Sequence, residues 1–169
     1  MVDIQSISIT LAALSFIVAA SYYIITLSYT RKNQQQQLET RQAQLFMQIY
    51  NQWNTTEFGL QYQKCMDMEW TDYDDFIIKY MDNAEEANRW RMMTRFFEGI
   101  GVLVYRGLID VALVDDLFSG EMTRFWEKFE PIIKELRVKW NWPQAVEWTE
   151  YLYNEVRAIM IKQHPELVT

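Results

Sequence analysis

The chain opens with a long apolar stretch that holds no charge. Residues 4–30 contain no charged side chain, and their centre is rich in Ile, Leu, Ala, Val and Phe. About 20 such residues cross a hydrocarbon core roughly 30 Å thick when they form a helix. The scattered Ser and Thr hydroxyls can bond to their own helix backbone, so they are compatible with a membrane. The pattern predicts an anchor over residues 1–30, with membrane lipid contacting residues 4–29.

The charges on either side of this stretch predict its orientation. Asp3 precedes it, whereas Arg31 and Lys32 follow directly and Arg41 comes soon after. Positive residues favour the cytoplasmic side of a transmembrane helix. We therefore expect a single-pass protein of the cell membrane, with its N-terminus outside and its domain in the cytoplasm.

A cleaved signal peptide is the alternative interpretation of the same stretch. Residues 18–20, Val-Ala-Ala, form an acceptable small-residue cleavage site. However, no Lys or Arg precedes the apolar run, and the run continues past this site to Leu27. An uncleaved anchor fits the pattern better.

Helical periodicity begins again after a polar interval. Residues 31–53 contain no Gly or Pro, and five apolar residues in them fall on one helical face: Leu38, Leu45, Phe46, Ile49 and Trp53. This pattern predicts an amphipathic stem helix that continues the anchor. Four of the five are candidates for pairing between the stems of two copies: Leu38, Leu45, Ile49 and Trp53.

Residues 54–169 have the periodicity of a soluble helical domain. Asn54, Thr71 and Asn83 each precede an acidic residue by three positions, which is the signature of a helix N-terminus. The helix after Asn83 has apolar residues at spacings of three and four, and it should end at Gly107 in a left-handed conformation.

The pattern of the remaining residues predicts three more helices. A short one over residues 111–118 ends at Ser119-Gly120, and the next covers residues 121–140 with a kink at Pro131. Pro143 is expected at the first position of the last helix. No alternating β-branched run predicts a strand. The fold class is therefore all-α: one N-terminal transmembrane helix, a stem, and a cytoplasmic antiparallel helical bundle.

The net charge of −7 is concentrated in one segment of the chain. Residues 54–86 hold nine acids against Lys64 and Lys79, which by themselves give −7. No basic stripe is available to neutralise phosphates, so nucleic acid is not expected as a partner.

Few side chains are suited to covalent or metal chemistry. Cys65 and His164 are the only cysteine and the only histidine, so neither an internal disulfide nor a zinc finger can form. Cys65 lies among acids, which disfavour a thiolate, and His164 lies beside Pro165 at a helix end. We expect no catalytic residue, no metal and no cofactor.

A group of acids and tryptophans is the candidate partner surface. The acids lack the spacing of a calcium loop, and they form either a solvated face or a docking surface for a basic partner. Trp53, Trp90, Trp140 and Trp148 fit apolar stripes and are assigned to the core. The other three tryptophans do not fit, and at least one of them is expected in the core; any exposed one is a typical binding hot spot. The candidate surface is Asp67, Glu69, Trp70, Asp72, Asp74, Asp75, Trp126 and Trp142.

Two glycines interrupt the helix that follows Asn83. Gly99 and Gly101 each cost about 1 kcal/mol relative to Ala in a helix interior. Glycines in such positions usually allow another helix to approach closely, so we assign both to tight packing.

A family resemblance rests on three segments of the domain. They are Arg95-Phe96-Phe97-Glu98, residues 101–133 (GVLVYRGLIDVALVDDLFSGEMTRFWEKFEPII) and residues 147–152 (EWTEYL). With them the chain resembles a family of uncharacterised prokaryotic proteins that have an N-terminal span and a helical domain of unknown function. The resemblance extends over residues 40–155. It implies a fold and an anchor, and it implies no activity.

These features favour a membrane-tethered, non-enzymatic protein-interaction module, such as a scaffold, accessory subunit or adaptor of a membrane complex. Its expected partner is another protein or a second copy of the chain. One alternative is a membrane-associated enzyme with a site of carboxylates and Tyr, which buried acids sharing one pocket would favour. The other alternative is a self-assembling stalk protein whose stems pair.

Overall fold

A computed structural model of the protein describes residues 3–168, with the side chains of Ser6, Leu167 and Val168 left out. The ends of the predicted anchor and of the domain, Met1, Val2 and Thr169, lie outside the described residues. The chain divides into two compact units, residues 1–41 and 42–169. The second half of the predicted stem therefore belongs to the folded domain.

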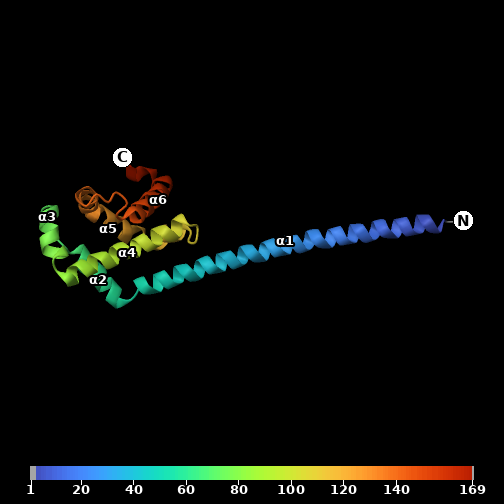
Figure 1. Ribbon diagram of the computed structural model, residues 1–169, viewed down its shortest axis with the longest axis horizontal. Coiled ribbons are helices and arrows are strands. Elements are labelled where there is room, and N and C mark those ends of the chain that lie inside the picture. The colour runs from blue at the N-terminus through green and yellow to red at the C-terminus, as the bar shows by residue number, and fades with distance from the viewer. Residues whose placement is uncertain (1–2, 169) are drawn as a thin grey trace. The chain divides into compact units, whose positions relative to one another are not determined.

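The described residues form helices and no strand, which confirms the all-α prediction. The elements are shown in Figure 1: α1 Ile4–Trp53, α2 Thr56–Met66, α3 Tyr73–Phe76, the π-helix η1 Ile77–Met81, α4 Ala84–Tyr105, α5 Val111–Lys139, α6 Glu147–Gln163 and the 3₁₀-helix η2 Pro165–Val168.

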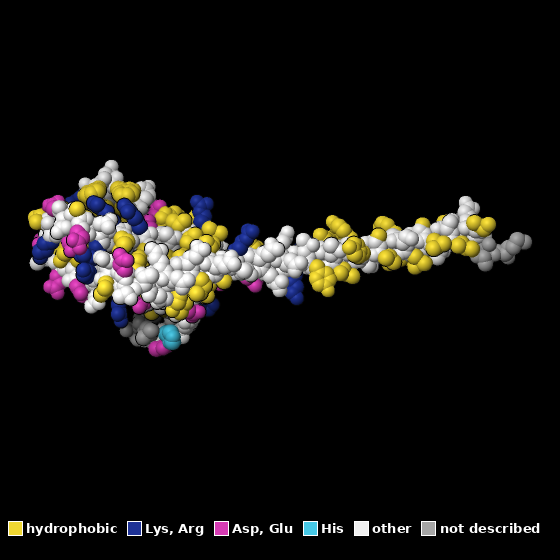
Figure 2. Space-filling model, turned by 90° about the horizontal axis from the view of Figure 1, so that it is seen from below, with side chains coloured by type: hydrophobic (Ala, Val, Ile, Leu, Met, Phe, Trp, Pro, Cys, Tyr) yellow, Lys and Arg dark blue, Asp and Glu magenta, His cyan; other side chains and the backbone are white. Residues whose placement is uncertain are grey.

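The first unit consists of the N-terminal part of α1, which presents apolar side chains to its surroundings. Every described side chain in residues 4–30 is exposed except Ala20, which is half-buried. An 18-residue window of α1 reaches a mean hydropathy of 1.9, and none of that window is buried. Hydrophobic side chains recur along this part of the helix in Figure 2. The helix is thus long and apolar enough to cross a membrane, as predicted.

The C-terminal part of α1 is packed into the domain. Phe46 is buried, and Leu45, Ile49 and Trp53 are partly buried against the same core. The Trp53 ring lies 5.4 Å from the Phe58 ring and 5.4 Å from the Phe96 ring, between centroids. Three of the four candidates for stem pairing are therefore engaged within their own domain. Leu38 is the exception, since 55% of its side chain is exposed.

The core of the domain is built from aromatic rings of α1, α4 and α5. Helix α6 packs against both α4 and α5 (Figure 1). Phe97 of α4 and Phe125 of α5 have ring centroids 5.0 Å apart. Gly101 allows α4 to approach α6 closely, because an added Cβ would lie 2.1 Å from the carbonyl oxygen of Trp148. The predicted packing role is confirmed for Gly101. It is wrong for Gly99, where an added Cβ would meet no atom within 4 Å.

Of the predicted helix caps and terminators, some coincide with the observed helix ends and others are off by one residue. Asn83 caps α4 as predicted, because its side-chain oxygen accepts bonds from the amides of Glu85 and Glu86. Gly107 ends α4 with a φ of 66°, which is also as predicted. The other two caps come one residue later than expected, at Thr55 and Asp72, where those side chains accept from the amides of Phe58 and Asp75.

The prediction of two helices over residues 111–140 is wrong, because α5 runs unbroken from Val111 to Lys139. The apolar stripe continues across Ser119-Gly120, with Phe118 and Met122 both fully buried. Burial of these side chains outweighs the cost of about 1 kcal/mol for a helical Gly. Gly120 also lacks the positive φ that ends α4 at Gly107.

The predicted start of the last helix at Pro143 is also wrong, because α6 begins at Glu147. The guanidinium of Arg137 donates to the carbonyl oxygens of Ala145 (2.8 Å) and Val146 (3.3 Å). It also pairs with the Glu150 carboxylate at 2.6 Å. This side chain from α5 therefore holds residues 140–146 in a non-helical turn.

Candidate functional site: two pockets beside α4

The acids of the predicted partner surface are largely occupied within the domain. Asp72 caps α3, Asp75 pairs with Lys79 at 2.8 Å, and Asp74 pairs with Lys139 at 2.6 Å. The hydrogen bond from Lys79 is the main reason that the pKa of Asp75 is lowered. Asp67 and Glu69 are exposed. Helix capping and ion pairing thus account for three of the five acids.

The tryptophans separate into buried and exposed ones in a way that the sequence did not predict. Trp126 is 1% exposed, so its place on a partner surface is wrong, and it stands against Tyr153 with ring centroids 6.0 Å apart. Trp70 is half-buried between the rings of Phe76 and Phe129. Trp142 is exposed, consistent with its prediction, and Trp140 is 60% exposed although it was assigned to the core.

The described part of the chain has few side chains that are suited to act as nucleophiles or metal ligands. Burial raises the pKa of the Cys65 thiol to about 12, so the thiol stays protonated at neutral pH. His164 is exposed, with Nδ1 3.2 Å from a carboxylate oxygen of Glu166. Among the described residues, no three His, Cys, Asp or Glu side chains converge as a metal site would require.

Two carboxyl groups of the described residues have a raised pKa, and they lie on different helices. Burial raises the pKa of Glu98 on α4 and of Asp115 on α5. A Glu98 oxygen accepts from the Thr149 amide (2.6 Å) and from the Thr149 hydroxyl (2.9 Å). Since Val146 supplies no side-chain cap for α6, Glu98 provides this cap from a neighbouring helix. The role of Glu98 is therefore structural, and no local sequence signal predicts it.

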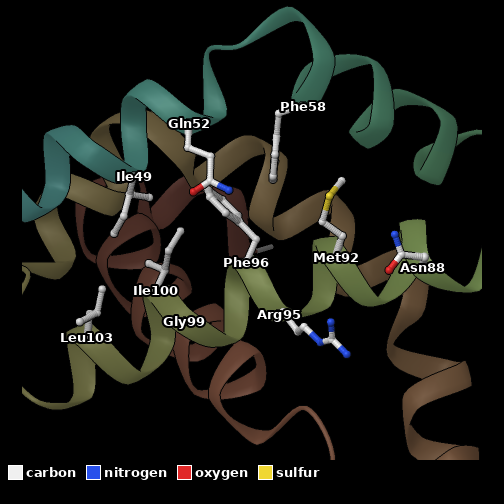
Figure 3. Close-up of a pocket in the computed structure, with 10 residues that line it drawn as sticks. All are labelled: Ile49, Gln52, Phe58, Asn88, Met92, Arg95, Phe96, Gly99, Ile100 and Leu103. Carbon is white, nitrogen blue, oxygen red and sulfur yellow. The ribbon is translucent and has the colours of Figure 1, made fainter.

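An open groove of about 490 Å³ lies between α4 and the α1–α2 corner. Figure 3 shows Ile49 and Gln52 of α1 and Phe58 of α2 pointing toward α4. Most of the α4 side is apolar, and Asn88 and Arg95 are its polar members. Gly99 leaves part of the floor bare, because no side chain fills the space above it. The groove is lined by Ile49, Gln52, Phe58, Asn88, Met92, Arg95, Phe96, Gly99, Ile100 and Leu103.

A second pocket, of about 440 Å³, lies on α4 among η1, the end of α5 and the turn before α6. We call it the tryptophan pocket. Its polar lining is Arg91, Thr94, Arg95, Glu98 and Gln144. Its apolar lining is Ile77, Met81, Trp90, Leu136, Trp140, Trp142, Ala145 and Val146. Trp90 is buried, and its indole N–H has no acceptor in the described structure, which costs about 1–3 kcal/mol for such a group.

The turn that borders the tryptophan pocket has a strained backbone. Asn141 has a φ of 48° and Val146 has a φ of 60°. The left-handed region costs an L-residue roughly 1–2 kcal/mol, and a β-branched side chain such as that of Val146 is rarely found there. Strain of this kind collects at functional sites and persists where neighbouring contacts enforce it. Here the contacts are those of Arg137 with Ala145 and Val146.

Neither pocket was predicted from the sequence, although the sequence contains one signal for each. The signal for the groove is Gly99. The close approach of α6 explains Gly101, but no packing contact explains a second glycine at position 99. Trp140 follows the apolar stripe of α5 but stands at the helix end, where a side chain can project beyond the bundle. Trp142 is the one member of the predicted partner surface that lines either pocket.

Comparison with known proteins gives a family without an assigned activity. No curated protein and no solved structure matches the chain. One family of domains matches residues 5–156, a range that includes the apolar part of α1 as well as the helical domain. The predicted resemblance to an uncharacterised family is thereby confirmed. The chain belongs to the family described as Domain of unknown function (DUF4760).

Proposed function

We propose that this protein is a single-pass, membrane-anchored interaction module without enzymatic activity. Residues 4–29 cross the membrane, the N-terminus is outside and the domain faces the cytoplasm. The support is the exposed, uncharged stretch of α1 together with the positive charges of Arg31 and Lys32 that directly follow it. An apolar helix surface of this length is unfavourable in water and favourable in lipid.

The bare floor of the groove at Gly99 is the observation that carries the interaction function. A glycine inside a helix costs about 1 kcal/mol relative to Ala, and Gly101 is explained by the close approach of α6. Gly99 touches nothing that would explain it within the described structure. Its surroundings are apolar and open, as Figure 3 shows. A surface that lacks a side chain at this point has room for a side chain of another protein.

The chemistry of the groove fits an amphipathic helix of a partner protein. The groove is bordered by helices, is mainly apolar along its length, and has polar groups of Gln52, Asn88 and Arg95. Helices bind such grooves through apolar residues at spacings of three and four, with polar contacts at the rim. The partner is therefore a protein that presents a helix with one apolar face.

Filling the groove tests this proposal. The full-length protein is purified by affinity from solubilised membranes as the wild type, as Gly99→Trp and as Gly120→Trp. Both positions are exposed helical glycines at which a Cβ meets no atom within 4 Å, so neither change should harm folding. We expect a stoichiometric partner with the wild type and with Gly120→Trp, and at least tenfold less with Gly99→Trp. Equal recovery by all three forms contradicts docking in the groove.

Labelling of introduced cysteines tests the orientation. Asp3→Cys and Gln163→Cys stand on opposite sides of the apolar stretch, and the native Cys65 is buried with a raised pKa, so it gives little background. A membrane-impermeant maleimide should label Asp3→Cys on intact cells and Gln163→Cys only after lysis. The opposite pattern reverses the orientation. Absence of Asp3 from the purified protein would instead indicate a cleaved signal peptide.

The enzyme alternative has less support than the interaction module. It calls for a pocket in which several carboxylates or tyrosines have a raised pKa. Glu98 lines the tryptophan pocket but is bonded to Thr149, and Asp115 lines neither pocket. Tyr62, whose pKa burial raises, donates its hydroxyl hydrogen to the carbonyl oxygen of Glu121. Glu98 and Tyr62 are therefore occupied by contacts that support the fold.

A further inference from the structure

We propose that the tryptophan pocket is a binding site for a small carboxylate with an aromatic body. This is a ligand site separate from the groove, and it does not depend on partner docking there. The two concavities share Arg95 and no other lining residue.

The size and enclosure of the pocket fit a small molecule. Its volume of about 440 Å³ lies within the range of roughly 300–1,000 Å³ that ligand pockets occupy. Its walls come from η1, α4, the end of α5 and the turn before α6, so a ligand would be contacted from several sides. This enclosure distinguishes it from a flat docking surface.

The charged groups of the pocket favour an anion. Two arginines, Arg91 and Arg95, line it against one acid, Glu98, although the whole chain carries a net charge of −7. Neither arginine makes an ion pair or hydrogen bond with a described residue, whereas a Glu98 oxygen already accepts from Thr149. A guanidinium matches a carboxylate in geometry and can bond it through two N–H groups. The available positive charge therefore calls for a carboxylate on the ligand.

The apolar walls favour an aromatic body. Trp140 and Trp142 are 60% and 54% exposed, so their indole surfaces are available to a ligand in the pocket. Indole faces gain energy from contact with another aromatic ring beyond that from buried area alone. Trp90 is a buried member of the same wall, so it adds a third indole to the apolar lining.

The strained turn contributes by holding the indoles in place before the ligand arrives. Asn141 and Val146, with positive φ, enclose the segment that carries Trp142. Arg137 bonds to the carbonyl oxygens of Ala145 and Val146 and thereby enforces this backbone. A rim that is fixed in advance lowers the ordering cost of binding.

Calorimetric titration of the full-length protein in lipid nanodiscs tests the site, with empty nanodiscs as the blank. The probes are phenylacetate and indole-3-acetate, and phenylacetamide is the neutral control of matched shape. We expect both carboxylates to bind at least tenfold more tightly than the amide, since a hydrogen bond between charged groups contributes that much. Equal binding of the amide, or no binding of either carboxylate at about 5 mM, overturns the proposal.

Variants then locate the binding. Arg91→Gln should weaken phenylacetate binding about tenfold and leave phenylacetamide binding unchanged, because only the carboxylate uses the guanidinium. Arg124→Gln, an exposed arginine of α5 outside the pocket, is the matched control and should change neither. Both changes are at exposed positions, so folding, followed by the melting curve, should be preserved. An equal loss in both variants, or none in Arg91→Gln, contradicts the assignment of the anion to this pocket.

Nuclear magnetic resonance of ¹⁵N-tryptophan-labelled protein gives a readout without any change to the pocket. The indole signals of Trp90, Trp140 and Trp142 should shift on adding indole-3-acetate, because an aromatic ligand next to them alters their local fields. The buried Trp126, which stands against Tyr153 outside the pocket, should stay in place. Shifts confined to other tryptophans would place the ligand elsewhere and overturn the proposal. The groove variant Gly99→Trp should bind the carboxylate normally, so failure of partner docking and failure of this site can be told apart.

Discussion

The two ends of α1 have similar side chains and opposite surroundings. Phe16 and Ile17, near the N-terminus, are 76% and 59% exposed. Phe46 is 4% exposed, and Ile49 is packed against the domain core. The helix itself is continuous from Ile4 to Trp53, so backbone structure does not distinguish the two ends. What distinguishes them is whether the rest of the chain supplies apolar contacts.

This difference separates two ways in which an apolar helix face can be satisfied. In residues 42–53 the hydrophobic effect is satisfied within the domain, by burial against α2, α4 and α5. In residues 4–30 the described structure offers no such burial, and the helix is long and apolar enough to cross a membrane. Substitutions after the boundary between the two compact units, at residues 41 and 42, should therefore lower the stability of the domain, and substitutions before it should not.

The largest expected effect is the loss of domain stability in Phe46→Ala. The Phe46 ring is buried and lies 5.8 Å from the Phe118 ring, between centroids. Truncation of a buried Phe costs about 3–5 kcal/mol of unfolding free energy. Chemical denaturation followed by near-UV circular dichroism measures it. Phe16→Ala is the matched change at the other end and should leave the transition where it is; a similar loss in both variants would refute the comparison.

The next effect is on membrane retention in Ile17→Arg. An arginine at the centre of a transmembrane helix costs about 2.5–3.5 kcal/mol in insertion. The protein should shift from the membrane fraction to the soluble fraction of a lysate, with the domain still folded. Met47→Arg, at an exposed position in the other part of α1, should remain in the membrane. If Ile17→Arg is retained as fully as Met47→Arg, residues 4–29 do not anchor the protein.

A smaller effect is expected just inside the domain boundary, in Gln42→Ala. The Gln42 side-chain amide donates to the carbonyl oxygen of Gly107 at 2.9 Å. A single hydrogen bond of this kind contributes about 1 kcal/mol to stability. The denaturation midpoint should fall by a corresponding, small amount. An unchanged midpoint in Gln42→Ala would mean that the contacts that stabilise the domain begin later in α1, nearer Phe46.

The smallest effect is expected just outside the boundary, in Leu38→Ala. Leu38 is 55% exposed, and surface changes away from special contacts usually alter stability by less than about 0.5 kcal/mol. The melting curve should be indistinguishable from that of the wild type. Leu38 is also the one stem-pairing candidate that stays exposed, so a clear loss of stability that depends on protein concentration would favour self-assembly through the stem.

Local signals in the sequence were sufficient for part of the fold. The uncharged run of residues 4–30, the Asn83 cap and the Gly107 terminator were all predicted correctly as features of helices. A helix cap depends on bonds between residues two or three positions apart, and Gly107 is chosen by its own φ. Such features need no information from the rest of the chain.

Contacts between distant residues decided the features that were not predictable from local sequence. Burial of Phe118 and Met122 carries α5 through Ser119-Gly120, and Arg137 delays the start of α6 to Glu147. Trp126 did not fit an apolar stripe and is buried, while Trp140 did fit one and is exposed. Periodicity predicts which face of a helix is apolar, but it does not predict where a neighbouring helix stops covering that face.

By itself, therefore, the sequence determined that the chain is helical, that it begins with an apolar helix of membrane-spanning length, and where α4 starts and stops. The tertiary structure alone decided the groove and the tryptophan pocket. Each concavity is enclosed by segments far apart in the chain, such as Ile49 with Leu103, or Ile77 with Trp142. The physical reason is that backbone hydrogen bonds and caps act over a few residues, whereas an unfilled space is defined by what several packed helices fail to cover.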